Sequence, residues 1–296
     1  MTRRGWFLFG ALCVIWGIPY LLIKIAVRDI SPAALVFLRT TLGTIVILPF
    51  SFRPGQLRPL LARWRPLALY TAVEIALPWF LLSDAERRLS SSLTGLLIAA
   101  VPLVGATLSA ASGGRERLDG RRVAGLLLGL AGVAALLGLD VGRGDLAAVA
   151  KMAVVVLCYA IGPLIISRRL ADVPSMPVVM VSLAACAVGY APFALTRLPV
   201  ALPSGEVVAA VVILGVVCTA LAFLVFFKLI AEVGPVRATV VTYVNPAVAV
   251  GLGVTLLHEP FTVGTGLGFV LILTGSFLAT RAAQTSPRAT SVAPAK

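Results

Sequence analysis

Long apolar segments, separated by short clusters of charged and turn-forming residues, run through almost the whole chain. A bilayer core is about 30 Å thick and a helix rises about 1.5 Å per residue, so about 20 apolar residues cross it. Only 12% of the 296 residues are charged, about half the usual share in a soluble domain. Backbone groups inside lipid must satisfy one another, which favours helices. The pattern predicts an all-α integral membrane protein.

Hydropathy and turn signals place the boundaries of these segments to within a few residues. The gaps between them are too short to hold a soluble domain. Ten transmembrane helices are expected, at 6–26, 33–51, 66–83, 91–111, 122–139, 147–166, 177–195, 207–227, 236–257 and 263–280.

The formal net charge of +13 comes from basic residues at the ends of the segments. They do not form a stripe on a polar face, so binding to nucleic acid is not expected. A cytoplasmic N-terminus places 17 of the 25 Lys and Arg residues in the cytoplasm. Such a bias predicts that both termini are cytoplasmic and that the number of spans is even.

Cysteine and histidine give no sign of a metal site or a disulfide framework. Cys13, Cys158, Cys186 and Cys218 all lie inside apolar segments, and His258 is the single histidine. A zinc site needs about four ligands at characteristic spacings. No metal, cofactor or catalytic residue is therefore expected.

The chain superposes on itself when it is shifted by about 143 residues. Pro102 then corresponds to Pro246, and Gly125 to Gly268. Each half holds five predicted helices, so the second half must enter the membrane in the opposite orientation. We expect two inverted five-helix repeats, 1–140 and 141–281, with a substrate site near the midplane between them. Residues 282–296 are rich in Ser, Thr, Pro and Ala and are expected to form a disordered cytoplasmic tail.

Several short motifs resemble those of the EamA family in the drug/metabolite transporter superfamily. They are Trp16-Gly17; the run AERRLS at 85–90 with Gly95 and Pro102; FFKLI at 226–230; VGPVRAT at 233–239; TYVNP at 242–246; and LHEP at 257–260. The resemblance covers residues 6–280. It implies ten helices in two inverted halves and a secondary transporter that exports small metabolites or drugs. We accordingly expect a multi-pass protein of the bacterial inner (plasma) membrane.

Glu74 and Arg39 are the ionisable residues placed deepest in the predicted spans. Burying a carboxylate in a membrane is costly, so Glu74 is a candidate site for a proton or for a substrate amine. An ion pair between Glu74 and Arg39 is the structural alternative. Arg39 could instead hold a substrate carboxylate through its two-pronged guanidinium, although a structural role is favoured.

Aromatic and amide side chains near the midplane complete the predicted site. Trp16 and Tyr159 correspond under the 143-residue shift, so both should face the interface between the two halves. Such rings can line a pocket, although helix packing or an interfacial aromatic belt explains them too, notably Tyr20 and Tyr190. The predicted substrate-binding residues are Trp16, Tyr20, Arg39, Glu74, Trp79, Tyr159, Tyr243 and Asn245.

Prolines and glycines within the spans suggest bending and close packing. Pro102 and Pro246 each remove a backbone hydrogen bond in mid-helix, so they are predicted hinges. The spacings Gly125-xxx-Gly129 and Gly264-xxx-Gly268 allow close helix approach, within one chain or in a homodimer. Glu259 and Glu116 lie in loops and are interpreted as caps or turn residues.

Three functional classes compete on this evidence. The first is a secondary exporter of amino acids or other amphipathic or aromatic compounds, working by alternating access and coupled to protons or to exchange. A nucleotide-sugar or phosphorylated-metabolite antiporter is the alternative within the superfamily, but it would need more cavity bases than Arg39. A membrane-embedded enzyme would need a nucleophile and base, and a channel would need a selectivity ring; the sequence shows neither.

Overall fold

The structure is a computed structural model that describes residues 1–51, 57–111, 120–140, 142, 145–197 and 202–281. The loop around Arg53, Glu116 and its neighbours, and the predicted tail at 282–296 lie outside this range. All the regular secondary structure in the described residues is helical. Its elements are α1 (Arg3–Gly17), α2 (Pro19–Ala26), α3 (Pro32–Ser51), α4 (Leu57–Ala62), α5 (Trp64–Tyr70), the π-helical segment η1 (Thr71–Ala76), α6 (Leu77–Ala85), α7 (Ser91–Ile98), α8 (Val101–Ala111), α9 (Gly120–Asp140), α10 (Leu146–Arg169), α11 (Ser175–Leu195), α12 (Gly205–Gly215), the π-helical segment η3 (Val216–Leu221), α13 (Ala222–Val233), α14 (Pro235–Ala238), α15 (Val241–Leu256) and α16 (Val263–Arg281).

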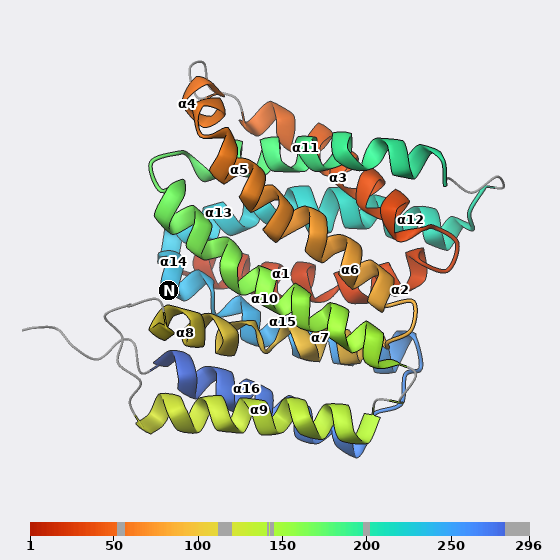
Figure 1. Ribbon diagram of the computed structural model, residues 1–296, viewed down its shortest axis with the longest axis vertical. Coiled ribbons are helices and arrows are strands. Elements are labelled where there is room, and N and C mark those ends of the chain that lie inside the picture. The colour runs from red at the N-terminus through yellow and green to blue at the C-terminus, as the bar shows by residue number, and fades with distance from the viewer. Residues whose placement is uncertain (52–56, 112–119, 141, 143–144, 198–201, 282–296) are drawn as a thin grey trace, which may run out of the picture.

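Most of these elements join into long apolar stretches that lie side by side (Figure 1). Eight stretches in the described residues are long and apolar enough to cross a membrane: Arg3–Ala26, Pro32–Ser51, Trp64–Ala85, Ser91–Leu108, Gly120–Asp140, Leu146–Arg169, Ser175–Leu195 and Gly205–Val233. Two shorter apolar helices, Val241–Leu256 and Val263–Ala279, follow. All ten predicted spans are thus helical, and eight meet the length expected of a membrane span.

Three predicted spans are broken rather than continuous. The first divides at Ile18, directly before Pro19 begins α2. The fourth divides at 99–100, where α7 ends and α8 begins one residue before Pro102. Proline lacks the amide hydrogen that a helix interior requires, which explains both breaks. The ninth was predicted to start at 236, but α15 starts at Val241, because the short α14 and a turn precede it.

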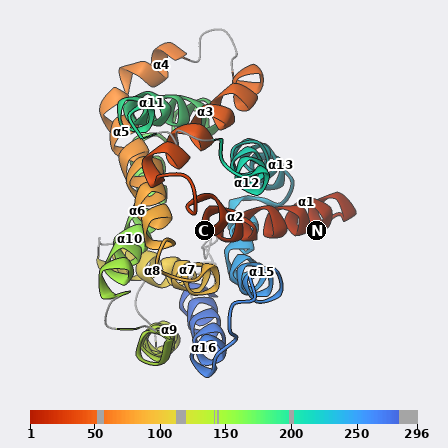
Figure 2. The same cartoon turned by 90° about the vertical axis from the view of Figure 1, so that its right-hand side faces the viewer.

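Helices from the two halves of the sequence are interleaved. Seen from the side in Figure 2, α12 and α13 lie beside α1, α2 and α3, while α15 lies beside α1 and α7. At one end of the molecule α9 packs along the whole of α16. A Cβ atom on Gly132 would lie 2.8 Å from the Ile272 backbone nitrogen, so these helices touch through their backbones. The predicted close approach of glycine-bearing helices is therefore made within one chain.

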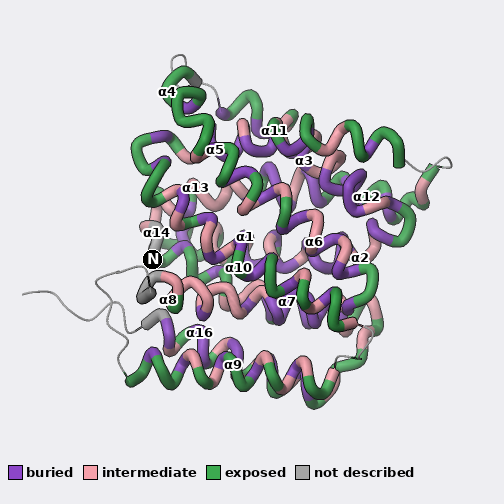
Figure 3. Tube along the Cα trace, in the orientation of Figure 1, coloured by how far each residue is buried: buried purple, intermediate pink, exposed green. Residues whose placement is uncertain are grey.

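Apolar side chains cover both the inside and the outside of the bundle. Figure 3 shows buried positions where helices face one another and exposed positions on the outer faces. Large apolar side chains lie on those outer faces, among them Phe7 and Val188, each 75% exposed. A water-soluble protein rarely exposes so much continuous apolar surface, whereas a lipid-facing surface requires it.

Candidate functional site

Two π-helical segments interrupt long helices in the third and eighth of these ten helical stretches. η1 lies between α5 and α6, and η3 lies between α12 and α13. Pro78 contributes to the first, because it cannot donate a hydrogen bond to the turn before it. The fourth residue of η1 is Glu74 and the fourth residue of η3 is Thr219. π-Helical segments inside longer α-helices occur frequently at functional sites.

Arg39 on α3 reaches the second of these segments. Its Nε donates a hydrogen bond of 2.9 Å to Oγ1 of Thr219, and that hydroxyl donates in turn to the carbonyl of Leu214, at 2.8 Å. The guanidinium carbon lies 3.7 Å from the centre of the Trp79 ring on α6, a cation–π contact. Arg39 therefore joins α3, α6 and η3, which supports the structural role favoured from the sequence.

Tyr159 and Tyr20 extend this cluster toward α10 and α2. Tyr159 packs against the cluster that contains Trp79, and its hydroxyl lies within electrostatic range of Tyr20, Glu74 and Arg39. Tyr20 is almost fully buried, and its ring packs near Gly95 of α7. The structure therefore brings together five of the predicted substrate-binding residues: Tyr20, Arg39, Glu74, Trp79 and Tyr159.

Glu74 is half-buried beside α10 and has one carboxylate oxygen without a hydrogen-bond partner. Its Oε2 atom is buried and unpartnered. The backbone of Gly162 lies directly against the carboxylate, so that a Cβ atom at 162 would overlap Oε2 and lie 2.8 Å from Cδ. The alternative ion pair with Arg39 is not formed, because Arg39 is directed to Thr219 and Trp79 instead.

The other three predicted binding residues lie outside this cluster. Trp16 packs on Phe226 of α13, with ring centres 4.9 Å apart. Tyr243 donates to the carbonyl of Ser276 on α16 at 3.4 Å. The Asn245 amide nitrogen, turned toward Cys13, donates to that residue's carbonyl at 3.2 Å. Their contacts hold helices together, as the packing interpretation expected.

Trp16 and Tyr159 nevertheless each contact a residue from the other half of the sequence. Trp16 contacts the second half through Phe226, and Tyr159 contacts the first half through Trp79. The two predicted hinges differ in their surroundings. Pro102 follows the break between α7 and α8, whereas Pro246 lies buried inside the unbroken α15.

An apolar groove lies at the side of the bundle. This groove of about 680 Å³ separates the stretch Trp64–Phe80 from α11, and none of the eight predicted binding residues lines it. Small side chains form much of both walls, including Ala72, Ala76 and Gly189. Tyr190 ties the walls together by donating to the carbonyl of Ala76 at 3.0 Å.

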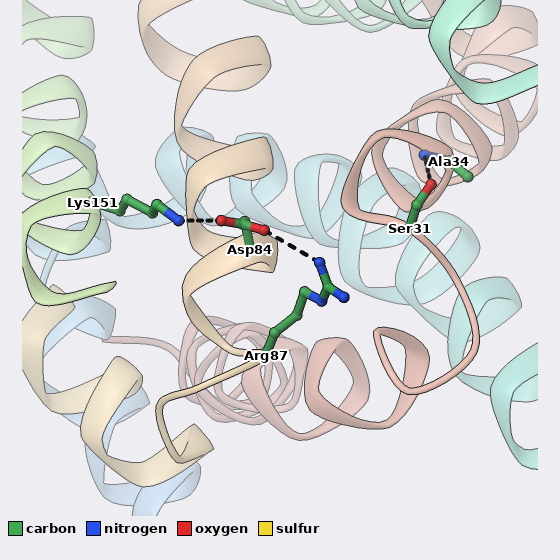
Figure 4. Close-up of polar contacts among 5 residues, drawn as sticks. All are labelled: Ser31, Ala34, Asp84, Arg87 and Lys151. Atoms are coloured by element: carbon green, nitrogen blue, oxygen red, sulfur yellow. Dashed lines mark hydrogen bonds and ion pairs between the residues drawn. The ribbon is translucent and has the colours of Figure 1, made fainter. Parts of the chain in front are cut away.

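A second, polar hollow of about 450 Å³ lies where α6 and α10 come together at one end of the bundle. Its walls are Asp84, Arg87, Arg88 and Lys151. Figure 4 shows Asp84 paired with Lys151 and, at 3.7 Å, with Arg87. Both basic partners are substantially exposed, and exposed ion pairs contribute little to stability.

The surroundings of three ionisable side chains, Glu259, Lys24 and Glu86, were not predicted in detail from the sequence. The Glu259 carboxylate accepts hydrogen bonds from the backbone and hydroxyl groups of Ser91 and Ser92, which confirms its interpretation as a cap. Lys24 donates to the carbonyls of Glu86 and Leu89 at 2.6 and 2.7 Å. Glu86 itself is fully buried. Among the described residues there is no group of three or more potential metal ligands.

The apolar helices and the ionisable groups enclosed between them define an all-helical membrane protein with multiple spans. Residues 3–138 and 146–281 each match the EamA-like transporter family, and the chain belongs to that family. The resemblance noted in the sequence is thereby confirmed.

Named relatives are transporters whose cargo is not specified. The chain is 31% identical over 261 residues to the "Uncharacterized inner membrane transporter YedA" of Escherichia coli K12, covering 85% of this chain and 83% of that protein. It is 23% identical to an "Uncharacterized transporter" of Archaeoglobus fulgidus, over 94% of this chain and 99% of the relative. A solved crystal structure, 24% identical, aligns over 97% of this chain and 100% of its own with a TM-score of 0.67, which supports the fold.

Proposed function

We propose that the protein is a secondary transporter that exports small amphipathic or aromatic metabolites by alternating access, with Glu74 binding a proton or a substrate amine. The observation that carries this proposal is the half-buried Glu74 carboxylate, which lies in mid-helix and has one buried oxygen without a partner. An acid of this kind is costly to keep inside a membrane and is retained where it takes part in transport.

The surroundings of Glu74 support a site that changes its occupant. Gly162 leaves room for the carboxylate without donating a hydrogen bond to it. Tyr159, Trp79 and Tyr20 supply aromatic faces and hydroxyl groups nearby. A protonated amine or a proton would supply the missing partner of Oε2, while an aromatic or apolar side chain of the cargo would meet the rings.

The topology expected from the sequence is part of the same proposal. Ten spans in two inverted five-helix repeats would place both termini in the cytoplasm, and the shorter α15 and α16 would cross with the others. The double match to one family, separated by 143 residues, supports the repeat. Fusing an alkaline phosphatase or a fluorescent protein to the C-terminus tests the orientation; activity of the phosphatase would contradict it.

The test of function compares Glu74→Gln with wild type in an efflux and resistance screen over amino acids, toxic analogues and cationic drugs. For any cargo found, reconstituted vesicles with a pH gradient should show saturable flux that the variant loses. Glu206→Gln, which changes an exposed acid in the first turn of α12, is the matched control. Unchanged proton-sensitive flux in Glu74→Gln would remove Glu74 from the mechanism.

The same screen decides between the competing classes. Nucleotide sugars and sugar phosphates belong in it, because an antiporter for phosphorylated cargo is the alternative within the superfamily. Arg39 already donates to Thr219 and stacks on Trp79, which leaves less of its guanidinium for a phosphate. Ohmic conductance without saturation would favour a channel.

A further inference from the structure

Glu86 is a fully buried carboxyl group at the end of a predicted span. It follows α6 directly, and its side chain is 0% exposed. Both of its carboxylate oxygens lack a hydrogen-bond partner. The next residue, Arg87, extends outward and pairs with Asp84 (Figure 4). The acid is therefore turned into the bundle although the bases beside it in sequence are not.

The charged groups around Glu86 come from three other elements. Lys24 of α2 and Arg39 of α3 attract its negative charge, and Glu259, which precedes α16, repels it. Tyr20 of α2 also lies within electrostatic range. Lys24 is in turn influenced by Arg28 at the end of α2.

The nearest base does not neutralise the carboxylate through a hydrogen bond. Lys24 Nζ donates to the backbone carbonyls of Glu86 and Leu89, not to the side-chain oxygens. Glu259, by contrast, is fixed by four hydrogen bonds from Ser91 and Ser92. An ionised Glu86 would therefore be a desolvated anion near a second anion. Burial raises the pKa of the Glu86 carboxyl well above its usual range, and Glu259 acts in the same direction.

We propose that Glu86 is a second proton-binding site of this transporter, holding its proton while this end of the bundle is closed and releasing it to water when the end opens. In the release step the carboxyl O–H bond breaks, the proton passes to an entering water molecule, and Lys24 turns from the two carbonyls to pair with the carboxylate. The site rests on the proposed transport function, but proton binding to Glu86 can be measured without any cargo.

The two acids would then mark different stages of one cycle. Glu74 lies in the middle of the stretch Trp64–Ala85, and Glu86 lies one residue beyond its end. Tyr20 and Tyr159, which lie within electrostatic range of each other, connect the surroundings of the two acids. A proton that enters at the Glu86 end of the bundle would meet Glu86, the two tyrosines and Glu74 one after another.

Infrared spectroscopy of the full-length protein in lipid vesicles tests the proposal. Protonated carboxyl groups absorb at higher frequency than carboxylates, so a pH titration counts buried acids that carry a proton. Wild type should show this band at neutral pH, and Glu86→Gln should lose one component of it. Glu206→Gln, with an exposed acid changed, should leave the band intact. A band unaltered by Glu86→Gln at every pH would overturn the proposal.

A second variant covers the case in which Glu86→Gln does not fold. Lys24→Met removes the attracting charge, so the Glu86 component should persist to a proton concentration at least tenfold lower than in wild type. No displacement of that component would contradict the proposed pairing. This test is independent of the test of Glu74. If Glu74→Gln left the flux unchanged, the proposed function would be overturned, but the infrared band of Glu86 would still be present.

Discussion

The two π-helical segments each interrupt a long helix, and each has a polar fourth residue, but these two residues differ in their hydrogen bonds. In η3, Thr219 is completely buried, accepts a hydrogen bond from Arg39 and donates one to Leu214. In η1, Glu74 keeps a buried oxygen with no partner. The polar side chain of η3 is therefore fully hydrogen-bonded to protein groups, whereas one carboxylate oxygen of η1 is not. This difference is the reason that the proposed function assigns the transport role to η1 and not to η3.

The helices facing the two segments differ in the same sense. At η3, α3 approaches so closely that a Cβ atom on Gly43 would lie 2.9 Å from Cγ2 of Thr219. At η1, α11 stands across the 680 Å³ groove, and a Cβ atom on Gly189 would meet nothing within 4 Å. Gly43 therefore permits close contact between α3 and η3, whereas Gly189 borders the groove between α11 and η1.

The largest effect should come from closing the space beside Glu74. Gly162→Ala would place a methyl group on the carboxylate, so we expect at least a tenfold loss of transport and about 1–3 kcal/mol of lost stability from overpacking. Flux in vesicles and equilibrium unfolding in mixed micelles measure these effects. In the double variant Gly162→Ala/Glu74→Ala, most of the stability cost of Gly162→Ala should disappear. If the stability changes of the two single variants simply added, the two residues would not clash.

Making η1 resemble η3 should stabilise the protein while inactivating it. Glu74→Thr removes a carboxylate that lacks a partner and adds a hydroxyl that can bond to its own helix. We expect a gain of about 1–3 kcal/mol, the usual cost of an unsatisfied buried polar group in proteins, together with loss of proton-sensitive flux. Equilibrium unfolding gives the first quantity. A destabilised variant would mean that Glu74 has a structural partner after all.

The difference in helix contact predicts opposite outcomes for a matched pair of glycine substitutions. Gly43→Ala should cost about 1–3 kcal/mol, because Thr219 and its backbone must move. Gly189→Ala should be neutral or stabilise by up to about 1 kcal/mol, because alanine favours the helix and the site is open. Heating with a thiol-reactive dye, which detects exposure of the four buried cysteines, ranks the two variants. An equal loss of stability in the two variants would argue against an open groove beside Gly189.

The smallest effect is expected at η3. Thr219→Val removes the Arg39 hydrogen bond but keeps the shape of the side chain. Hydrogen bonds between membrane helices average about 0.6 kcal/mol, so we expect a change of that order, with the Trp79 contact still holding Arg39. Flux should fall less than twofold. A loss comparable to that of Gly162→Ala would instead place Thr219 in the transport site.

Much of the fold could be predicted from the sequence because hydropathy acts locally. All ten predicted segments are helical, and Glu74 was found because an acid stands out in an apolar run. The breaks at Ile18 and at 99–100 depend on which prolines bend a helix, which neighbouring helices decide. The start of α15 was misjudged because α14 continues the apolar pattern across a turn.

The partners in the site were beyond local prediction. Arg39 finds Thr219, which lies 180 residues away in sequence, and threonine in an apolar run gives no signal of this contact. Glu86 was passed over because an acid followed by two arginines is usually solvated. The sequence gives one weak signal for Gly162, because the 143-residue shift places this glycine close to the position that corresponds to Gly17. Its meaning depends on Glu74 lying opposite.

The pairing of α9 with α16 bears on how the protein is made. Gly125 and Gly129 meet the backbone of Gly275, yet α9 ends at Asp140 and α16 ends at Arg281. At a synthesis rate of about 5–20 residues per second, α9 leaves the ribosome roughly 7–28 s before its partner is complete. During that interval Leu103 of α8 can cover Gly129, but the part of the face that meets α16 has no partner helix from this pairing. The last of the described helices to be synthesised is therefore the main packing partner of a helix from the first half of the sequence.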